Sequence, residues 1–237
     1  MAAIEIVGDD NHVLINDEYK NMILVEKKKV YFEVSPWEMM KGATADVTYT
    51  SGLSTPPILA LNSGFPVVAQ SLKRTGNTYI WNITAGAAGR GGTCEAYIFH
   101  LPDEVPDAHG LVQIRNENGV LVFDTNLEYA KVERSFEYEL NKQLYMDVPA
   151  DRKYAAVTSS FAGEFGALQY PPLTRPPLYG VAESHMRGGF YMTPGRINTN
   201  TFLLTHRTYA VTNPVVDIWR NRKGILLVLD VTGIKWD

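Results

Sequence analysis

The chain contains a second version of part of its own sequence, and this internal repeat constrains the fold more than any other feature. Residues 66–84 match residues 214–232 at a constant offset of 148 (214 − 66 = 148), with identity at six of nineteen positions. An unrelated pairing of that length should give about one identity on ordinary amino-acid frequencies. The repeat therefore predicts two copies of one folding unit.

Shorter matches extend the repeat toward the amino terminus. They pair residues 13–17 with 120–124, residues 25–27 with 132–134, and residues 30–34 with 144–148. The offset grows from 107 (120 − 13) to 114 (144 − 30) and then to 148. The second copy therefore carries an insertion of 34 residues (148 − 114), which we place at about 161–197.

Strand-type sequence dominates the chain, and helix-type periodicity is nearly absent. Short runs of β-branched and aromatic residues, such as 78–83, are separated by Gly, Asn, Asp and Pro. The acidic, proline-bearing segment Leu101–Asp107 is typical of a semi-rigid linker. We predict an all-β protein of two tandem β-sandwich domains related by internal duplication, residues 1–105 and 106–237, with an inserted loop at about 161–197.

Charge and hydropathy exclude two classes of partner. The net charge is −4, and the few basic runs are short, which argues against nucleic-acid binding because phosphate recognition needs clustered Lys and Arg. No stretch approaches the eighteen apolar residues of a membrane span, and the start lacks the pattern of a signal peptide. We expect no nucleic acid, no membrane insertion and synthesis in the cytoplasm.

Sequence motifs for catalysis, metals and cofactors were not found. The five histidines lack metal-ligand spacing, and the single Cys94 excludes an internal disulfide and a Cys-built zinc site. The glycine-rich segment 86–92 lacks the Lys-Ser/Thr ending of a phosphate-binding loop. We expect no catalytic residue, metal or cofactor, and a protein that is not an enzyme. A glycan depolymerase stays as a lesser alternative, because its paired carboxylates have no sequence signature.

The insertion at about 161–197 has an unusual composition. It holds a proline-rich run, 171–177, followed by a run rich in Met and aromatic residues, 185–192. Either it covers its own domain as a lid, or it contacts a neighbouring subunit. For the second case we predict partner contacts through its large apolar side chains, because such side chains dominate interface energetics. These are Phe161, Tyr170, Leu178, Met186, Phe190 and Tyr191.

One segment of the second copy resembles a known family. Residues 110–124 read Gly-Leu-Val-Gln-Ile-Arg-Asn-Glu-Asn-Gly-Val-Leu-Val-Phe-Asp. This resembles the opening of small tailed-bacteriophage proteins associated with the tail tip and tail fibres, in which the chain enters as Gly-Leu-x-Ile/Val-x-Asn, turns on Gly and returns as Val-x-Asp. The later Pro-Val-Val run and the strand Glu95–Phe99 also look like that family's pattern. The first copy departs from it, since His12 stands where Gly119 stands in the second.

The resemblance implies a structural protein of the distal phage tail, here as a tandem duplication. The family offers no catalytic residues to carry over. We therefore expect a virion component at the tail tip, baseplate or fibre, synthesised and assembled in the bacterial cytoplasm, with other tail proteins as partners and several copies per particle. The alternative is a host-receptor or carbohydrate-binding attachment module, which would place Trp37, Trp81 or Trp219 against sugar faces. Trp81 lies within a repeated strand, which favours core packing for it.

Overall fold

The protein is almost entirely β-structure, which confirms the predicted class. The computed structural model describes residues 5–7, 13–16, 21–34, 42–102, 110–116, 118–172, 179–211 and 218–234. Within these, residues 5–7, 13–16, 166–172, 179–182, 207–211 and 218–219 are described by their backbone alone. The described chain contains no α-helix, and its single 3₁₀ turn covers Ala87–Gly89.

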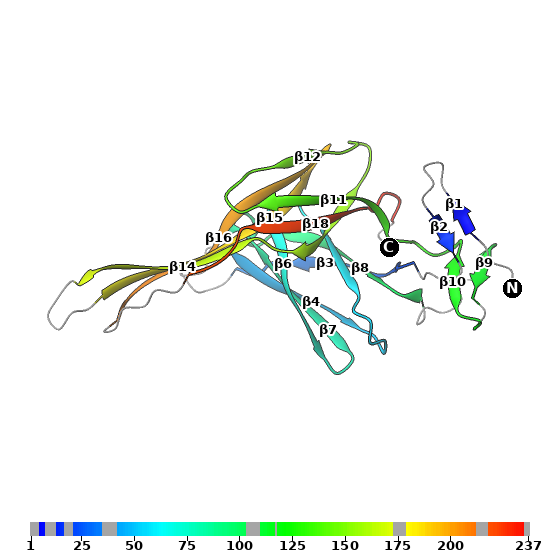
Figure 1. Ribbon diagram of the computed structural model, residues 1–237, viewed down its shortest axis with the longest axis horizontal. Coiled ribbons are helices and arrows are strands. Elements are labelled where there is room, and N and C mark those ends of the chain that lie inside the picture. The colour runs from blue at the N-terminus through cyan, green and yellow to red at the C-terminus, as the bar shows by residue number, and fades with distance from the viewer. Residues whose placement is uncertain are drawn as a thin grey trace.

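Two large antiparallel sheets form the body of the molecule (Figure 1). The first has the strand order β11-β18-β13-β5-β8-β3. Its members are β3 (Ile23–Tyr31), β5 (Ile58–Asn62), β8 (Thr93–His100), β11 (Lys131–Glu139), β13 (Tyr154–Ser160) and β18 (Lys223–Asp230). We call it the six-stranded sheet.

The second sheet has eight strands. Its main path is β12-β16-β15-β6-β7-β4, formed by β12 (Tyr145–Asp147), β16 (Arg196–Val211), β15 (Tyr179–Thr193), β6 (Val67–Thr75), β7 (Thr78–Ala85) and β4 (Ala43–Thr50). Off this path, β14 (Gly163–Pro172) pairs with β15 and with β17 (Ile218–Asn221). Two small hairpins, β1 (Glu5–Val7) with β2 (Val13–Asn16) and β9 (Gln113–Arg115) with β10 (Leu121–Asp124), complete the fold.

The strand order is palindromic in both sheets, and each half of the chain contributes three strands to each main path. In the six-stranded sheet β3, β8 and β5 mirror β11, β18 and β13; in the other, β4, β7 and β6 mirror β12, β16 and β15. The two outer strand pairs of the six-stranded sheet also share an irregularity in register. Pairing of β3 with β8 is interrupted by a bulge between Leu24 and Glu26, and pairing of β11 with β18 by a bulge between Val132 and Arg134.

The two halves do not form separate sandwiches, which corrects the expected boundary at residue 105. β5 of the first half pairs with β13 of the second, so that Ala60 faces Val157 in the middle of the six-stranded sheet. An ion pair of 2.6 Å between Lys153 and Glu95 also joins the halves. Each half therefore completes the sheets of the other, and the chain folds as one sandwich.

The repeat at an offset of 148 does not join equivalent strands. Residues 80–84 lie in β7 of the eight-stranded sheet, whereas residues 228–230 lie in β18 of the six-stranded sheet. By position β18 corresponds to β8, at an offset of 130 (223 − 93). The inserted loop is also corrected: the segment 161–197 contains β14, β15 and the start of β16.

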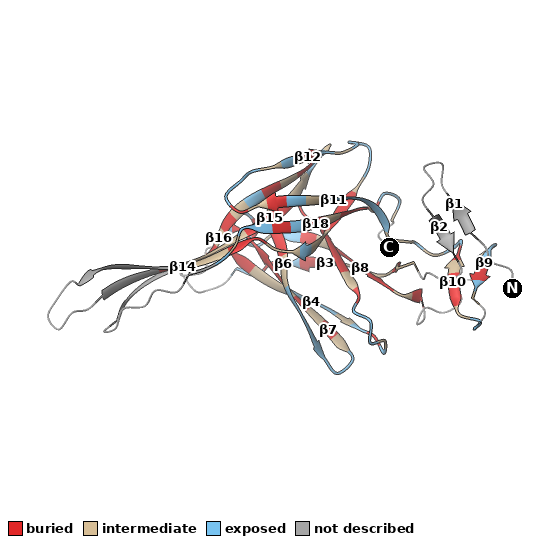
Figure 2. Cartoon of the chain, in the orientation of Figure 1, coloured by how far each residue is buried: buried red, intermediate tan, exposed pale blue. Residues whose placement is uncertain are grey.

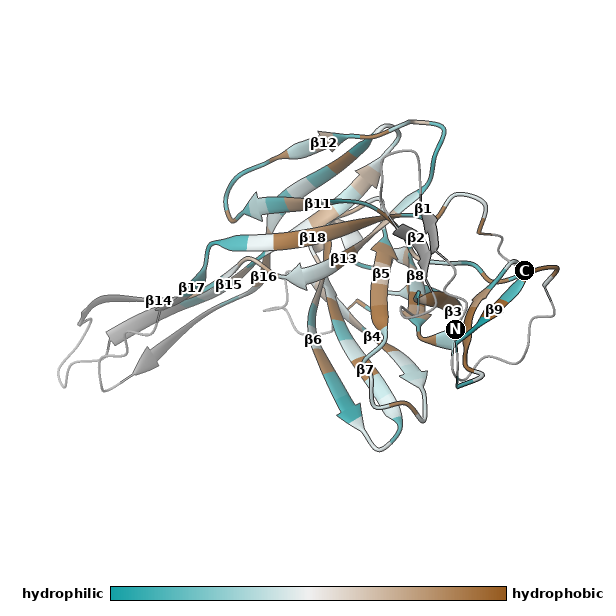
Figure 3. Cartoon of the chain, turned by 45° about the vertical axis from the view of Figure 1, so that its right-hand side comes forward, coloured by the Kyte–Doolittle hydropathy of each residue, from teal (hydrophilic) through white to brown (hydrophobic). Residues whose placement is uncertain are grey.

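The main core lies between the two sheets, and strand alternation explains which residues enter it. In β7 the buried residues Tyr79, Trp81 and Ile83 alternate with half-buried ones, as expected for a strand with one face on the core. Figure 2 shows buried residues concentrated in this central body, and Figure 3 shows hydrophobic residues along β5 and β18. The core draws on both halves of the chain, including Phe32 and Leu61 from the first and Tyr138 and Phe190 from the second.

A second core lies on the other face of the six-stranded sheet. It is formed by Ala60, Tyr97, Phe99, Ala155, Leu229 and Val231. Beside this core, Ile23 at the start of β3 forms an antiparallel bridge with Tyr129. On either side of the bridge, the N–H of Leu24 donates to the carbonyl oxygen of Glu128, and the N–H of Ala130 donates to that of Met22. We call this short contact the seam. Because residues 128–130 lead directly into β11, the two outer strands of the sheet approach each other there, and the sheet curls around this second core.

Candidate functional site

A three-stranded extension projects from the body of the molecule (Figure 1). It is formed by residues 163–172, 179–187 and 205–211 of β14, β15 and β16, and we call it the arm; at its base β17 pairs with residues 163–166 of β14. β15 and β16 pair continuously from the arm into the body, from Tyr179–Val211 to Thr193–Arg196. The arm is therefore the outer part of a hairpin whose inner part belongs to the core.

The six predicted contact residues are divided between the arm, its base and the core. Phe190 is fully buried between the sheets, so its side chain offers no surface to a partner, and that part of the prediction is wrong. Phe161, Met186 and Tyr191 are half-buried. Tyr170 lies on β14 and is described by its backbone alone, and Leu178 lies outside the described residues.

The base of the arm contains a partly buried cation. The guanidinium carbon of Arg187 lies 5.4 Å from the centre of the Phe161 ring, an arrangement that fits a cation–π contact. Its Nη1 donates to the carbonyl oxygen of Met186 at 3.0 Å, whereas its Nε is buried without a hydrogen-bond partner. Burial lowers the pKa of Arg187, because the charged form loses hydration. Of the predicted residues, the structure thus brings Phe161 and Met186 together around Arg187.

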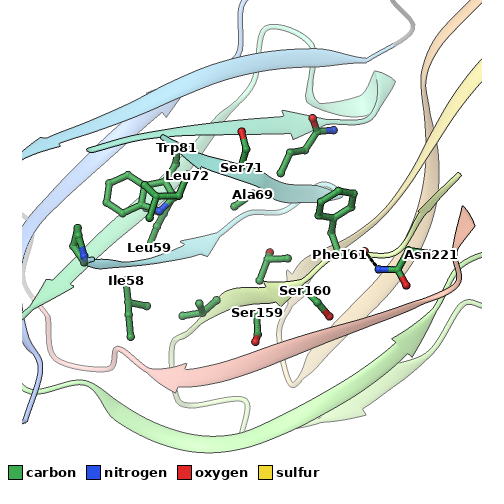
Figure 4. Close-up of a pocket in the computed structure, with 14 residues that line it drawn as sticks. Ile58, Leu59, Ala69, Ser71, Leu72, Trp81, Ser159, Ser160, Phe161 and Asn221 are labelled. Carbon is green, nitrogen blue, oxygen red and sulfur yellow. Dashed lines mark hydrogen bonds between the residues drawn. The ribbon is translucent and has the colours of Figure 1, made fainter. Parts of the chain in front are cut away.

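A cavity of about 450 Å³ opens between the sheets next to this base. Figure 4 shows Ile58, Leu59, Leu72 and Trp81 at one end, Phe161 and Asn221 at the other, and serines along the sides. The side-chain Nδ2 of Asn221 donates to the carbonyl oxygen of Phe161 at 2.8 Å. The size of the cavity and its largely apolar walls are those of small-ligand sites in proteins.

Two polar side chains that line the cavity have buried atoms without hydrogen-bond partners. They are Nε2 of Gln70, on β6, and Oγ1 of Thr158, on β13. An amide N–H left unpaired in an apolar setting loses the free energy of its hydration.

Of the three tryptophans proposed for sugar contact, the structure describes the side chain of Trp81. Trp81 lines the cavity but is only 5% exposed, so most of its ring packs in the core, as its repeated strand indicates. Trp37 lies outside the described residues, and the side chain of Trp219 is not described.

Titratable groups of the described residues do not assemble into a metal site. No group of three or more His, Cys, Asp and Glu that could hold an ion occurs in the part of the chain that the structure describes. Burial raises the pKa of the Cys94 thiol to about 12, with the nearby Glu95 carboxylate adding to the effect, so this thiol stays protonated at neutral pH. A search of the described residues found no helix with the length and apolar character of a membrane span.

The structure explains the opening motif of the second copy, residues 110–124. The buried carboxylate of Asp124 accepts hydrogen bonds from the backbone of Gly110 at 3.2 Å and from Nε2 of Gln113 at 2.6 Å. A Cβ at Gly110 would lie 2.0 Å from Oδ1 of Asp124, so only glycine fits there. Oδ1 of Asn116 accepts from the backbone of Asn118 and Val120, which holds the turn. The motif therefore specifies a local hairpin.

Comparison with models of known protein families, with curated proteins and with solved structures gave no match.

Proposed function

We propose that this protein is a structural component of the distal tail of a tailed bacteriophage, at the tip, baseplate or fibre, and that it acts by protein–protein assembly. The observation that supports this best is the arm, which extends β15 and β16 well beyond the sandwich that anchors them (Figure 1). The resemblance of residues 110–124 to tail-associated phage proteins supplies the phage context. Other tail proteins are its partners, and each particle holds several copies.

The dimensions of the arm suit an assembly contact. Nine residues of β15, 179–187, at about 3.3 Å each give a length of roughly 30 Å, and three strands give a width of about 14 Å. Its two faces together therefore offer roughly 800 Å², which is about one partner's share of a standard protein interface. Anchoring in the core fixes the direction of the arm, which reduces the entropy lost when a partner binds.

The test is tag-labelled electron microscopy of phage particles that carry either the natural protein or a variant with a shortened arm. In the variant, residues 170–180 are replaced by Asn-Gly, which joins the paired residues Gln169 and Val181 through a two-residue turn. We expect label at the distal tail for the natural protein and none for the folded variant. Absence of the natural protein from particles would refute the virion assignment, and normal incorporation of the variant would refute the role of the arm.

A second candidate, a receptor- or carbohydrate-binding attachment module, is favoured by the cavity beside Trp81. The residues that line it include Gln70 and Thr158, whose polar side chains suit a ligand rich in hydroxyl groups. Binding of the purified protein to host cells or to a glycan array, lost on Gln70→Ala, would support this candidate. A shortened-arm protein that still enters particles would add to that support.

A further inference from the structure

The outer strands of the six-stranded sheet have backbone edges that the described residues leave mostly uncovered. β3 pairs with β8 along its length. On its other side the described contacts are the seam at Ile23 and Leu24, the hydrogen bond that Nζ of Lys28 donates to the carbonyl oxygen of Thr48 and, just past the end of the strand, the bridge of Glu33 with Thr44. β11 pairs with β18, and the described residues place no strand on its other side. Such edges can accept a further strand through main-chain hydrogen bonds.

The two edges carry opposite charge. Lys27 and Lys29 of β3 lie opposite Tyr97 and Glu95 of β8, on the sheet face away from the main core. On the same face of β11 stand Glu137 and Glu139, since they alternate with the core-facing Tyr138. One edge of the sheet is therefore basic and the other acidic.

The direction of the strands permits these edges to pair. The five pairings from β3 to β11 are all antiparallel, so β3 and β11 run in opposite directions. A neighbouring copy placed beyond β3 in the same orientation would present its β11 antiparallel to β3. No reversal of either strand is needed.

We propose that copies of this protein associate head to tail, with β3 residues 27–31 of one copy pairing with β11 residues 135–139 of the next. One register places Lys27 opposite Glu139 and Lys29 opposite Glu137. The same register places Val30 opposite Phe136, and both of these face the main core of their own copy. Opposite charges and apolar residues thus meet on their respective faces.

The charges also select between modes of association. A twofold dimer through β3 would place lysines opposite lysines, and a twofold dimer through β11 would place glutamates opposite glutamates. Both arrangements are destabilising, because like charges would face each other. A head-to-tail contact is complementary, and repeated it generates a ring or a filament. Glu137 and Glu139 already pair with Lys223 at 2.6 Å and with Lys142 at 2.7 Å. These exposed ion pairs are weak enough to exchange with a neighbour's lysines.

The test measures the mass of the purified protein by sedimentation velocity over a concentration series, at about 50 and about 500 mM salt, a range that spans strong and weak screening. We expect oligomers that dissociate at the higher salt. Lys27→Glu/Lys29→Glu and Glu137→Lys/Glu139→Lys should each weaken association by about tenfold or more, because each places like charges across the contact. In a mixture of the two variants, each acidic edge of the first variant can pair with a basic edge of the second. Association should therefore return.

A matched control changes two lysine or arginine charges elsewhere. Lys73→Glu/Arg74→Glu alters two exposed residues of β6, in the other sheet, by the same total charge and should associate as the natural protein does. Melting curves confirm that every variant is folded. A protein that stays monomeric under all conditions, or a mixture that associates no better than its components, would overturn the proposal.

A cross-link tests the register. The proposed pairing sets Tyr31, which is 56% exposed, opposite Ser135 of the neighbour. Oxidation of Tyr31→Cys/Ser135→Cys should give a ladder of covalent oligomers, whereas either single variant should stop at a dimer. Cys94 is buried and does not interfere. A double variant without a ladder, in a protein that still oligomerises, would contradict this contact.

Discussion

At the scale of single residues, one side chain joins the strands that support the arm. Tyr138 is 1% exposed, and its hydroxyl donates to the carbonyl oxygen of Gly188 at 3.2 Å and accepts from the backbone N–H of Ala162 at 3.3 Å. Burial raises its pKa to about 12, because the phenolate would lose hydration. The side chain of Tyr138 thus connects β11 to β15 and to the segment between β13 and β14.

The glycine beneath this ring should not tolerate a methyl group. A Cβ at Gly224 would lie 2.3 to 2.5 Å from atoms of the Tyr138 ring, so the ring or the strand has to move. We expect Gly224→Ala to lower the free energy of unfolding by about 1–3 kcal/mol, the usual cost of overpacking a core. Urea unfolding measures this. The matched control is Gly64→Ala, where a Cβ meets nothing within 4 Å, and an equal loss in the control would contradict the packing argument.

At the scale of elements, the hairpin of β15 and β16 has two different functions along its length. Its inner part carries buried Phe190, Ile197 and Phe202, whereas its outer part forms the arm. The length of these strands, 15 and 16 residues, is what allows one element to do both. The insertion inferred from sequence therefore cannot be removed as a unit.

Two deletions should separate these functions. Removal of residues 161–197 takes away Ala162, Phe190 and Ile197, and we expect the remainder not to unfold cooperatively, because burial of one Phe alone contributes about 3–5 kcal/mol of a typical total of about 5–15. Replacement of 170–180 by Asn-Gly should leave the melting temperature within a few degrees. Circular dichroism on heating measures both. A cooperative transition in the larger deletion would show that the inner hairpin is dispensable.

At the scale of the whole molecule, the two halves of the chain share both sheets and the main core. The six-stranded sheet crosses from one half to the other between β5 and β13, and the other sheet crosses at the Val67–Phe190 bridge. The amide of Asn62 also donates to the backbone carbonyl of Tyr154 across the halves. A half on its own would expose the core face of two three-stranded sheets.

We therefore expect one cooperative unfolding transition for the full chain and no stable fold for either half alone. Residues 1–105 and 106–237, expressed separately, should show little chemical-shift dispersion, because each half lacks the strands that cover its core. Their co-expression should recover a folded complex. Independent cooperative unfolding of either fragment would instead favour two autonomous domains.

Short-range patterns in the sequence were enough to predict the all-β class and the local hairpin of residues 110–124. These depend on near neighbours: on the composition of short runs, and on side chains such as Asn116 and Asp124 that bond within their own hairpin. The sequence also placed Trp81 in the core, through its position in a strand.

How the two halves of the chain combine could not be read from such local patterns. The pairing of β5 with β13, the burial of Phe190 and the correspondence of β8 with β18 depend on contacts between residues far apart in the chain. The sequence match at an offset of 148 was misleading, because strands of similar pattern occur in both sheets and similarity alone does not say which sheet a strand joins. The basic and acidic edges are likewise visible only once β3 and β11 are known to be the outer strands of one sheet.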